Sequence, residues 1–168
     1  FFNDEIPAEW VLGQIESRGG RRIFCVFVES QGVSLVRYRN GVYGLLATGD
    51  LEGWGPAIRL VGDQGIIEIG AERDVPLRLW GHEQGAWTVV PVSEGLHGED
   101  CVMRGVLDLI DALKKGREPE LSARKALQAT ELIFATYESA RLRGRVDLPL
   151  QIEDSPLLTL LAEGAIHE

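Results

Sequence analysis

The sequence predicts an α+β domain, in which a mainly antiparallel, open β-sheet carries helices packed on one face. Two observations lead to this prediction. Short segments rich in β-branched and aromatic residues, separated by turn residues, fill roughly the first ninety positions. Segments with the period of an amphipathic helix follow them. Because the strands precede the helices instead of alternating with them, we expect hairpin connections and not the crossovers of a parallel sheet.

Eight segments have the composition of strands. Asn40-Gly41 lies between two of them and is a strong hairpin signal, because both residues tolerate a positive φ angle. The turn 62–65, which begins and ends with glycine, predicts a second hairpin. The expected strands cover residues 10–18, 22–29, 33–39, 42–48, 57–61, 66–69, 76–80 and 86–90, and residues 146–150 are expected to be extended ahead of and through Pro149.

Two longer segments and a short one predict helices. The first covers residues 99–115, ends at Gly116, and has an apolar stripe made of Val102, Met103, Val106, Leu107, Ile110 and Leu113. The second covers residues 122–142, with Ser122 as its N-cap. One of its faces is expected to consist of Ala126, Thr130, Ile133, Tyr137 and Ala140. Two helices and a tail do not easily cover both faces of a sheet, so the free face is the expected place for a substrate, a partner domain or a second subunit.

The last segment begins a helix at Ser155-Pro156 and is closed by Gly164. Leu157, Leu158, Leu160 and Leu161 cover most of its circumference, so this helix must dock on something. We expect it to cover the core of its own domain; the alternative is a latch between subunits. We assign residues 1–150 to one domain and residues 151–168 to a C-terminal tail with this helix.

Composition narrows the class of protein. The chain has 168 residues and a formal net charge of −9, which disfavours nucleic acid as a partner. It has neither an apolar run long enough to span a membrane nor a signal peptide, so we expect no membrane partner and a cytoplasmic location. Cys25 and Cys101 lack metal spacing and are expected to be buried, reduced thiols. Because the chain opens on Phe1 without a structural signal, we expect it to be an internal fragment of a longer protein.

Motifs that would indicate catalysis are missing from the sequence. It has no G-x-G-x-x-G, no phosphate-binding P-loop, no G-x-S-x-G and no H-E-x-x-H. The loop 95–100 precedes a helix and could hold an anion, although a plain loop is the favoured interpretation. His82, His97 and His167 lack partners at ligand spacing, so no metal site is expected. We interpret Asp108 and Asp111 as solvated and Ser139 as a small residue that lets its helix approach the sheet.

Trp54 is the exception. It lies between two glycines, Gly53 and Gly55, in a loop that offers an indole few core neighbours. An indole in such a loop can stack on a ring or a sugar face, or insert into a neighbouring domain. Packing of the loop against its own domain is an equally weighted interpretation.

An ordered set of motifs resembles the C-terminal part of the Gfo/Idh/MocA oxidoreductases. The set comprises the hairpin YRNGVYG (38–44), the hairpin IRLVGDQGIIEI (58–69), and the helical stretch 106–150, which contains YESA (137–140) and VDLP (146–149). The resemblance implies a two-domain enzyme that uses NAD or NADP, whose N-terminal Rossmann domain and catalytic residues lie outside this chain. It also implies that Trp54, eight residues before Gly62, stands where many members carry a substrate-facing aromatic residue. The matching position of Arg59 is often acidic in that family.

We therefore expect a substrate-binding and oligomerisation domain of an NAD(P)-dependent dehydrogenase acting on a sugar, polyol or related hydroxy compound. The fragment alone is expected to be inactive and to bind no cofactor. The alternatives are a non-catalytic assembly module with the same fold and an unrelated α+β binding domain. The segments 22–29 and 33–38 are apolar on both faces, which predicts a homo-oligomer through the free sheet face.

Overall fold

The structure, a computed structural model, describes residues 6–17, 22–23, 26–49, 55–72, 74–93, 98 and 100–166. The chain divides into two compact units. The first unit combines Phe1–Leu51 with Leu121–Glu168, and the second is Glu52–Glu120. Helices and antiparallel strand pairs together confirm the predicted α+β class, but the described strands form two four-stranded sheets, one in each unit, and a separate two-stranded pair.

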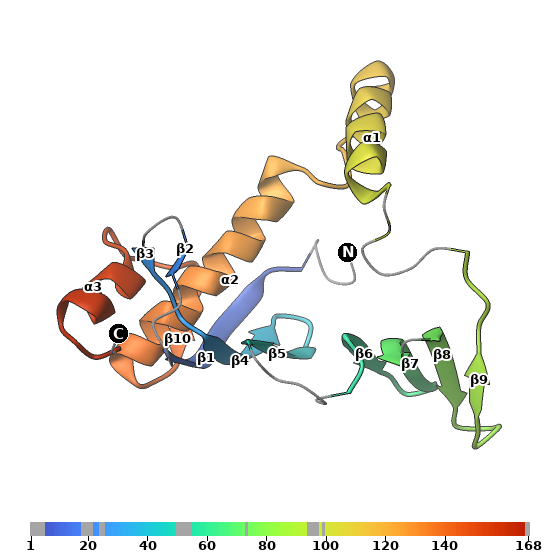
Figure 1. The fold of residues 1–168 in the computed structure, drawn as a ribbon, viewed down its shortest axis with the longest axis horizontal. Helices are drawn as coiled ribbons and strands as arrows, with labels where there is room; N and C mark the ends of the chain where they lie inside the picture. The colour runs from blue at the N-terminus through green and yellow to red at the C-terminus, as the bar shows by residue number, and fades with distance from the viewer. Residues whose placement is uncertain are drawn as a thin grey trace. The chain divides into compact units, whose positions relative to one another are not determined.

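The sheet of the first unit has the strand order β10-β1-β4-β5 (Figure 1). Its strands are β1 (Ala8–Glu16), β4 (Gln31–Tyr38), β5 (Tyr43–Gly49) and β10 (Val146–Asp147), and all the pairs are antiparallel. The hairpin predicted at Asn40-Gly41 joins β4 to β5, and Gly41 has the positive φ of 92° that such a turn requires. The extended segment near Pro149 supplies β10, which pairs with β1.

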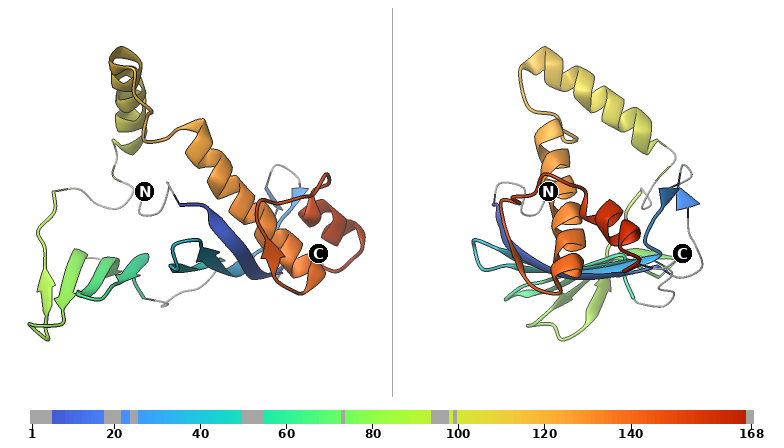
Figure 2. Two further views of the ribbon diagram at one scale, coloured as in Figure 1. Left: turned by 180° about the vertical axis from the view of Figure 1, so that it is seen from behind. Right: turned by 90° about the vertical axis from the view of Figure 1, so that its left-hand side faces the viewer.

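One face of this sheet carries α2 (Ala123–Leu142), and α3 (Pro156–Ala162) packs against α2 on the same side (Figure 2). Ser122 caps α2 as predicted, accepting a hydrogen bond from the Lys125 amide at 3.2 Å. The helix ends at Arg143, which adopts the left-handed conformation itself, with φ of 52°, although Gly144 follows it. Its amide donates to the Ser139 carbonyl and so satisfies one of the terminal carbonyl groups.

The predicted face of α2 is buried only in part: Ala140 is buried, and Tyr137 packs against the same apolar cluster. Ala126, Thr130 and Ile133 are exposed. The sheet instead meets small residues, including Ala135 and Ser139, which are fully buried. Small side chains leave little hydrophobic periodicity in the sequence, but they allow the helix to lie close to the strands.

Two apolar clusters hold this unit together. The first joins the sheet to the middle of α2 through Val11, Val36, Ala135 and Val146. The second joins the end of β1 to the end of α2 and to the C-terminal tail through Ile15, Ala140, Leu160 and Ile166. The tail helix thus covers a core within its own unit, as its leucines predict.

The predicted strand 22–29 is wrong as a single element. The described residues form two short strands, β2 (Arg22–Ile23) and β3 (Val26–Phe27), which pair with each other. Residues 24 and 25 between them, including Cys25, lie outside the described residues. Composition indicates strand propensity along the whole segment, but it does not specify which of its residues pair with one another.

The second unit contains the sheet β6-β7-β8-β9 and the helix α1 (Cys101–Lys115). Its strands are β6 (Ile58–Val61), β7 (Gly65–Glu72), β8 (Val75–Gly81) and β9 (Trp87–Val89), all antiparallel. The helix ends at Gly116 in the left-handed conformation, as predicted. All six residues of its predicted apolar stripe are exposed.

Cys101 is exposed as well, which contradicts its predicted burial. It is the first residue of α1, whose only buried residue is Ala112. Apolar residues beside Cys101 in the sequence therefore did not imply that its side chain is buried. None of the described helices is long and apolar enough to cross a membrane.

Candidate functional site

Three charged side chains form a row across the sheet of the second unit. Arg59 on β6 pairs with Glu68 on β7, and Glu68 pairs with Arg78 on β8. Directly paired residues point to the same face of a sheet, so the register alone brings the three side chains together. Arg59 Nε lies 2.6 Å from Glu68 Oε1, and Arg78 Nε lies 2.6 Å from Glu68 Oε2. Each carboxylate oxygen therefore accepts from a different guanidinium group.

Glu68 is 0% exposed, although it is a charged residue on a sheet face. Burial alone would raise the pKa of its carboxyl group. The hydrogen bonds and positive charges of Arg78 and Arg59 outweigh burial and hold the pKa of Glu68 below its ordinary value of 4.5. The carboxylate is thus ionised near neutral pH and keeps both arginine side chains in fixed positions.

Aromatic residues lie beside this row. The Arg78 guanidinium lies 4.4 Å from the centre of the Trp87 ring, and its Nη1 lies 3.2 Å from Glu72. Trp80 pairs with Trp87 across β8 and β9, on the same face as Arg78 because the two positions on β8 are two residues apart. The face therefore combines guanidinium groups with indole rings. The opposite face carries Thr88 on β9 and otherwise aliphatic side chains: Ile58, Leu60, Ile67, Ile69, Leu77 and Leu79.

A second surface lies on the sheet of the first unit, on the face opposite α2. Residues that alternate with the buried Val11 and Val36 point to this face, and Leu12, Leu35 and Leu45 form one row across it. Leu45 is 68% exposed. In the neighbouring row, the Trp10 and Tyr43 rings contact each other edge to face at a centroid distance of 6.0 Å. Arg37 lies between these two residues in register, with its guanidinium 4.4 Å from the centre of the Tyr43 ring, so this free face is apolar and aromatic apart from one cation.

The YESA segment of α2 docks this helix on its unit. The Gly13 amide donates to Ser139 Oγ at 2.8 Å, and Ser139 Oγ donates to the Gly144 carbonyl at 2.6 Å. Ser139 therefore helps helix and strand to approach each other, as its small size predicted. Glu138 is buried and accepts two hydrogen bonds from the Arg141 guanidinium, at 2.7 Å each.

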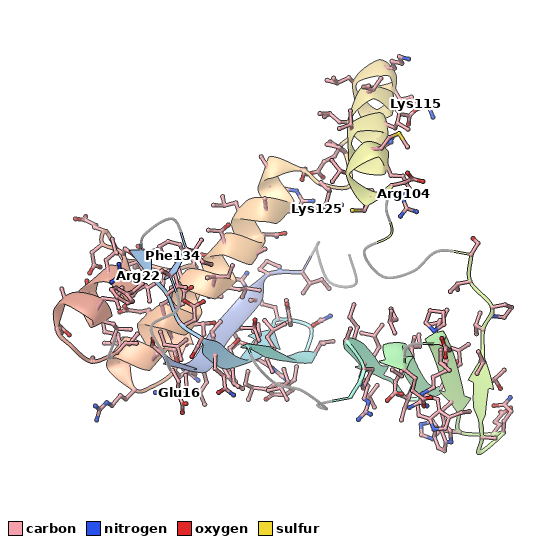
Figure 3. The ribbon with its side chains drawn as sticks, in the orientation of Figure 1. Glu16, Arg22, Arg104, Lys115, Lys125 and Phe134 are labelled. Carbon is pink, nitrogen blue, oxygen red and sulfur yellow. The ribbon has the colours of Figure 1, made fainter. Side chains whose placement is uncertain are left out.

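Tyr137 of the same segment donates from its hydroxyl group to Glu29 Oε1 at 2.8 Å. The other oxygen of this carboxylate, Oε2, is buried without a hydrogen-bond partner. Burial, together with the neighbouring Glu29 carboxylate, raises the pKa of the Tyr137 hydroxyl above its ordinary range. Phe134, which is labelled on α2 in Figure 3, contacts the Tyr137 ring edge to face.

Trp54, the predicted substrate-binding residue, lies outside the described residues, as do His97 and His167. His82 contacts the Trp80 ring edge to face at 4.9 Å. Asp108 and Asp111 both pair with Arg117, and Asp111 also pairs with Lys115, which is labelled in Figure 3. The two aspartates therefore join an ion-pair network at the end of α1. Among the described residues, no group of histidine, cysteine and acidic side chains could hold a metal ion.

The sequence interpretation missed the row of Arg59, Glu68 and Arg78. The signal was available: Arg59 and Glu68 are symmetric about the predicted turn 62–65, and such positions pair in a two-strand hairpin. What the sequence did not provide is the register of β8, because that strand leaves β7 through an irregularity between Ile69 and Glu72.

No protein-family model matches the sequence, and no curated protein matches it. The fold, in contrast, is shared with many solved structures. An oxidoreductase domain protein from Kribbella flavida matches with a TM-score of 0.69 and 23% identity, over 87% of this chain and 46% of that one. The WlbA dehydrogenase from Bordetella pertussis, in complex with NADH and UDP-GlcNAcA, matches with a TM-score of 0.57 and 26% identity, over 86% and 40%.

A levoglucosan dehydrogenase in complex with NADH and levoglucosan matches with a TM-score of 0.65 and 19% identity, over 86% of this chain and 46% of that one. These neighbours are oxidoreductases of the Gfo/Idh/MocA type, which confirms the predicted resemblance at the level of the fold. The chain spans less than half the length of each solved protein.

Proposed function

We propose that this chain is the C-terminal, substrate-binding and oligomerisation domain of an NAD(P)-dependent dehydrogenase of the Gfo/Idh/MocA family, acting on a sugar, polyol or related hydroxy compound. One observation carries the proposal. Most of the chain shares its fold with less than half of several oxidoreductases that were crystallised with NADH. A domain that accounts for less than half of such an enzyme needs a partner domain, and we assign that role to an N-terminal Rossmann domain of the same protein.

The described residues do not fit a dinucleotide site. Such a site is formed where a parallel strand leads through a glycine-rich turn into a helix, whose N-terminus receives the pyrophosphate. Every strand pair in the described part of the chain is antiparallel, and no described strand passes directly into a helix. We therefore assign NAD or NADP to the Rossmann domain, together with the catalytic residues.

In this division of roles, the chain orients the substrate and joins the subunits. Hydride transfer requires the carbon that bears the hydroxyl group to lie against the nicotinamide while a base takes the hydroxyl proton. We assign substrate contact to Trp54, whose indole can stack on a sugar face. We assign the homo-oligomer contact to the free sheet face around Leu12, Leu35 and Leu45. We also expect the protein to be cytoplasmic.

The exposed apolar face also favours a second candidate, a non-catalytic assembly module with the same fold. A protein that only dimerises through this face would need no catalytic residues. The two candidates differ outside the chain: an enzyme needs the family's catalytic lysine and histidine, whereas an assembly module does not.

The test measures oxidation of neutral sugars, polyols and hydroxy acids by the full-length natural protein with NAD+ or NADP+. Turnover is followed by the absorbance of the reduced nicotinamide. We expect turnover with at least one class. Calorimetric titration of this chain alone with NADH and NADPH is the matched control, and no binding in the micromolar range is expected. The assembly module would be favoured if the natural protein oxidises no class of substrate and its own sequence has other residues in place of the catalytic lysine and histidine.

A further inference from the structure

We propose that Arg59 and Arg78 form an anion site on the sheet β6-β7-β8-β9, which takes the carboxylate group of an acidic sugar. This inference deepens the proposed function and rests on it for the statement that the ligand is a substrate. The binding site itself rests on the geometry of the three charged side chains.

Contacts within the row fix the orientation of both arginine side chains. Two of the three nitrogens of Arg59, Nε and Nη2, contact Glu68 Oε1 at 2.6 and 2.5 Å. Arg78 is fixed by Glu68, by Glu72 and by the Trp87 ring. A guanidinium group whose rotamer is already fixed loses less conformational freedom when it binds a ligand. The buried carboxylate therefore preorganises the two cations.

The Glu68 and Arg59 side chains differ in their exposure to water. The Glu68 side chain is 0% exposed, whereas that of Arg59 is 55% exposed. Arg59 thus uses one edge of its guanidinium group to cover the carboxylate and presents the rest to water. The planar guanidinium group matches a carboxylate, which can accept two parallel N–H bonds.

The charges of the row balance one another. Glu68 and Glu72 pair with the two arginines, so the four side chains carry no net charge before a ligand binds. Glu72, which is mostly exposed, lies at the Arg78 end of the row and not at the Arg59 end. Arg59 shares its carboxylate partner with Arg78, so a monoanion such as a carboxylate meets less repulsion at this row than a phosphate dianion does.

An apolar and aromatic row lies beside the charged row. Two residues further along the strands, Val61, Ile66, Trp80 and Trp87 form an apolar and aromatic row on the same face. A sugar ring has apolar C–H faces that suit such a row, and an acidic sugar combines such a ring with a carboxylate. A charged row of this kind adds little to stability compared with apolar residues of the same size. Binding accounts for its presence on a sheet whose other face carries aliphatic side chains at the paired positions, apart from Thr88 on β9.

The test titrates the chain with D-glucuronate, D-glucose and D-glucose 6-phosphate, followed by calorimetry and by the NMR signal of the Arg59 Nε–H group. We expect glucuronate to bind and to shift this signal, and neither glucose nor glucose 6-phosphate to bind as tightly. Arg59→Gln should weaken glucuronate binding by about tenfold, the loss of one charge-assisted contact, and Arg59→Lys should weaken it less. Tighter binding of the phosphate, or no preference for glucuronate over glucose, would overturn the proposal.

Arg145→Gln is the matched control. The Arg145 side chain is 57% exposed and pairs with one carboxylate, Asp147, so it matches Arg59 in exposure and charge but lies outside the charged row. It should leave glucuronate binding unchanged; an equal loss in both variants would mean that binding does not depend on the position of Arg59. The NMR signal in the unsubstituted chain keeps the test decisive even if Arg59→Gln lowers stability.

The natural protein separates this inference from the proposed function. A preference for uronic acids over neutral sugars in kcat/KM, reduced by Arg59→Gln, would support both. Oxidation of neutral sugars alone, unchanged by Arg59→Gln, would overturn the carboxylate site and leave the dehydrogenase intact. Glucuronate binding at Arg59 without any oxidation would support the site and count against the dehydrogenase.

Discussion

Gly13 and Ser139 are separated by 126 positions in the sequence, yet the Gly13 amide donates to Ser139 Oγ at 2.8 Å. The contact is possible because neither residue holds the helix away from the strand. A Cβ atom at Gly13 would lie 2.7 Å from Thr136 Cγ2 and 3.2 Å from Ser34 Cβ. This approach positions α2 on the sheet and leaves the opposite face of the sheet free.

We predict that Gly13→Ala lowers the free energy of unfolding by about 1–3 kcal/mol, because the added methyl group overpacks the contact between β1 and α2. Urea denaturation followed by circular dichroism measures the change. Gly32→Ala in the neighbouring strand is the control, since its Cβ would meet atoms only at 3.4 Å and beyond. Equal losses in the two variants would contradict the close approach at Gly13.

Ser139→Ala tests the polar half of the same contact. It leaves the partly buried Gly13 amide and Gly144 carbonyl without the Ser139 hydroxyl, so we expect a loss of about 1–3 kcal/mol in the free energy of unfolding. Thr130→Ala, an exposed position on the same helix, should change it by less than about 0.5 kcal/mol. A Ser139→Ala protein as stable as the Thr130→Ala protein would show that water replaces the hydroxyl at no cost.

Stability should fall in alkali because of Tyr137. Its pKa is raised in the folded protein, first by burial and then by Glu29, whereas the unfolded chain titrates near the ordinary value of 10.0. Above that pH the unfolded state loses the proton while the folded state keeps it, so the free energy of unfolding decreases as pH rises. Urea denaturation at about pH 8 and about pH 11 should show the decrease, and Tyr137→Phe should make it smaller. Tyr38, whose pKa is also raised by burial, accounts for a remainder.

The free sheet face predicts the oligomeric state. We expect the chain to be a dimer at tens of micromolar in light scattering, and Leu45→Asp to make it monomeric by placing a charge on an apolar interface. Leu127→Asp is the control, because Leu127 on α2 is 69% exposed, nearly the same as Leu45. A monomeric unsubstituted chain, or a monomer produced equally by both substitutions, would exclude this face as the interface.

Trp54→Ala separates a substrate contact from a structural role. If Trp54 faces substrate, the melting temperature of the chain should change by only a few degrees, as for a surface residue. In the natural protein, kcat/KM should fall by roughly tenfold or more, the loss of one stacking contact. Trp54→Phe retains a ring and should lose less activity. A large fall in melting temperature with unchanged kinetics would identify Trp54 as a core residue.

The sequence by itself determined the elements whose signals are local. Asn40-Gly41 specifies its hairpin because few residue pairs accept the backbone angles of that turn. Ser122 and Gly116 mark helix ends because capping depends on one or two residues. The ordered motifs between residues 38 and 149 were enough to indicate an oxidoreductase-type fold, which the solved structures share.

The tertiary structure alone decided which surfaces meet. Periodicity grouped Ala126, Thr130 and Ile133 with Tyr137 and Ala140 on one face of α2, but only the last two pack in a core cluster. The sheet meets small residues, because close packing depends on the combined shape of helix and strand. The division of the strands into two sheets followed from hydrogen-bond pairing that composition does not encode. The row of Arg59, Glu68 and Arg78 needed the register of three strands, and register is a relation between distant segments and not a property of any one of them.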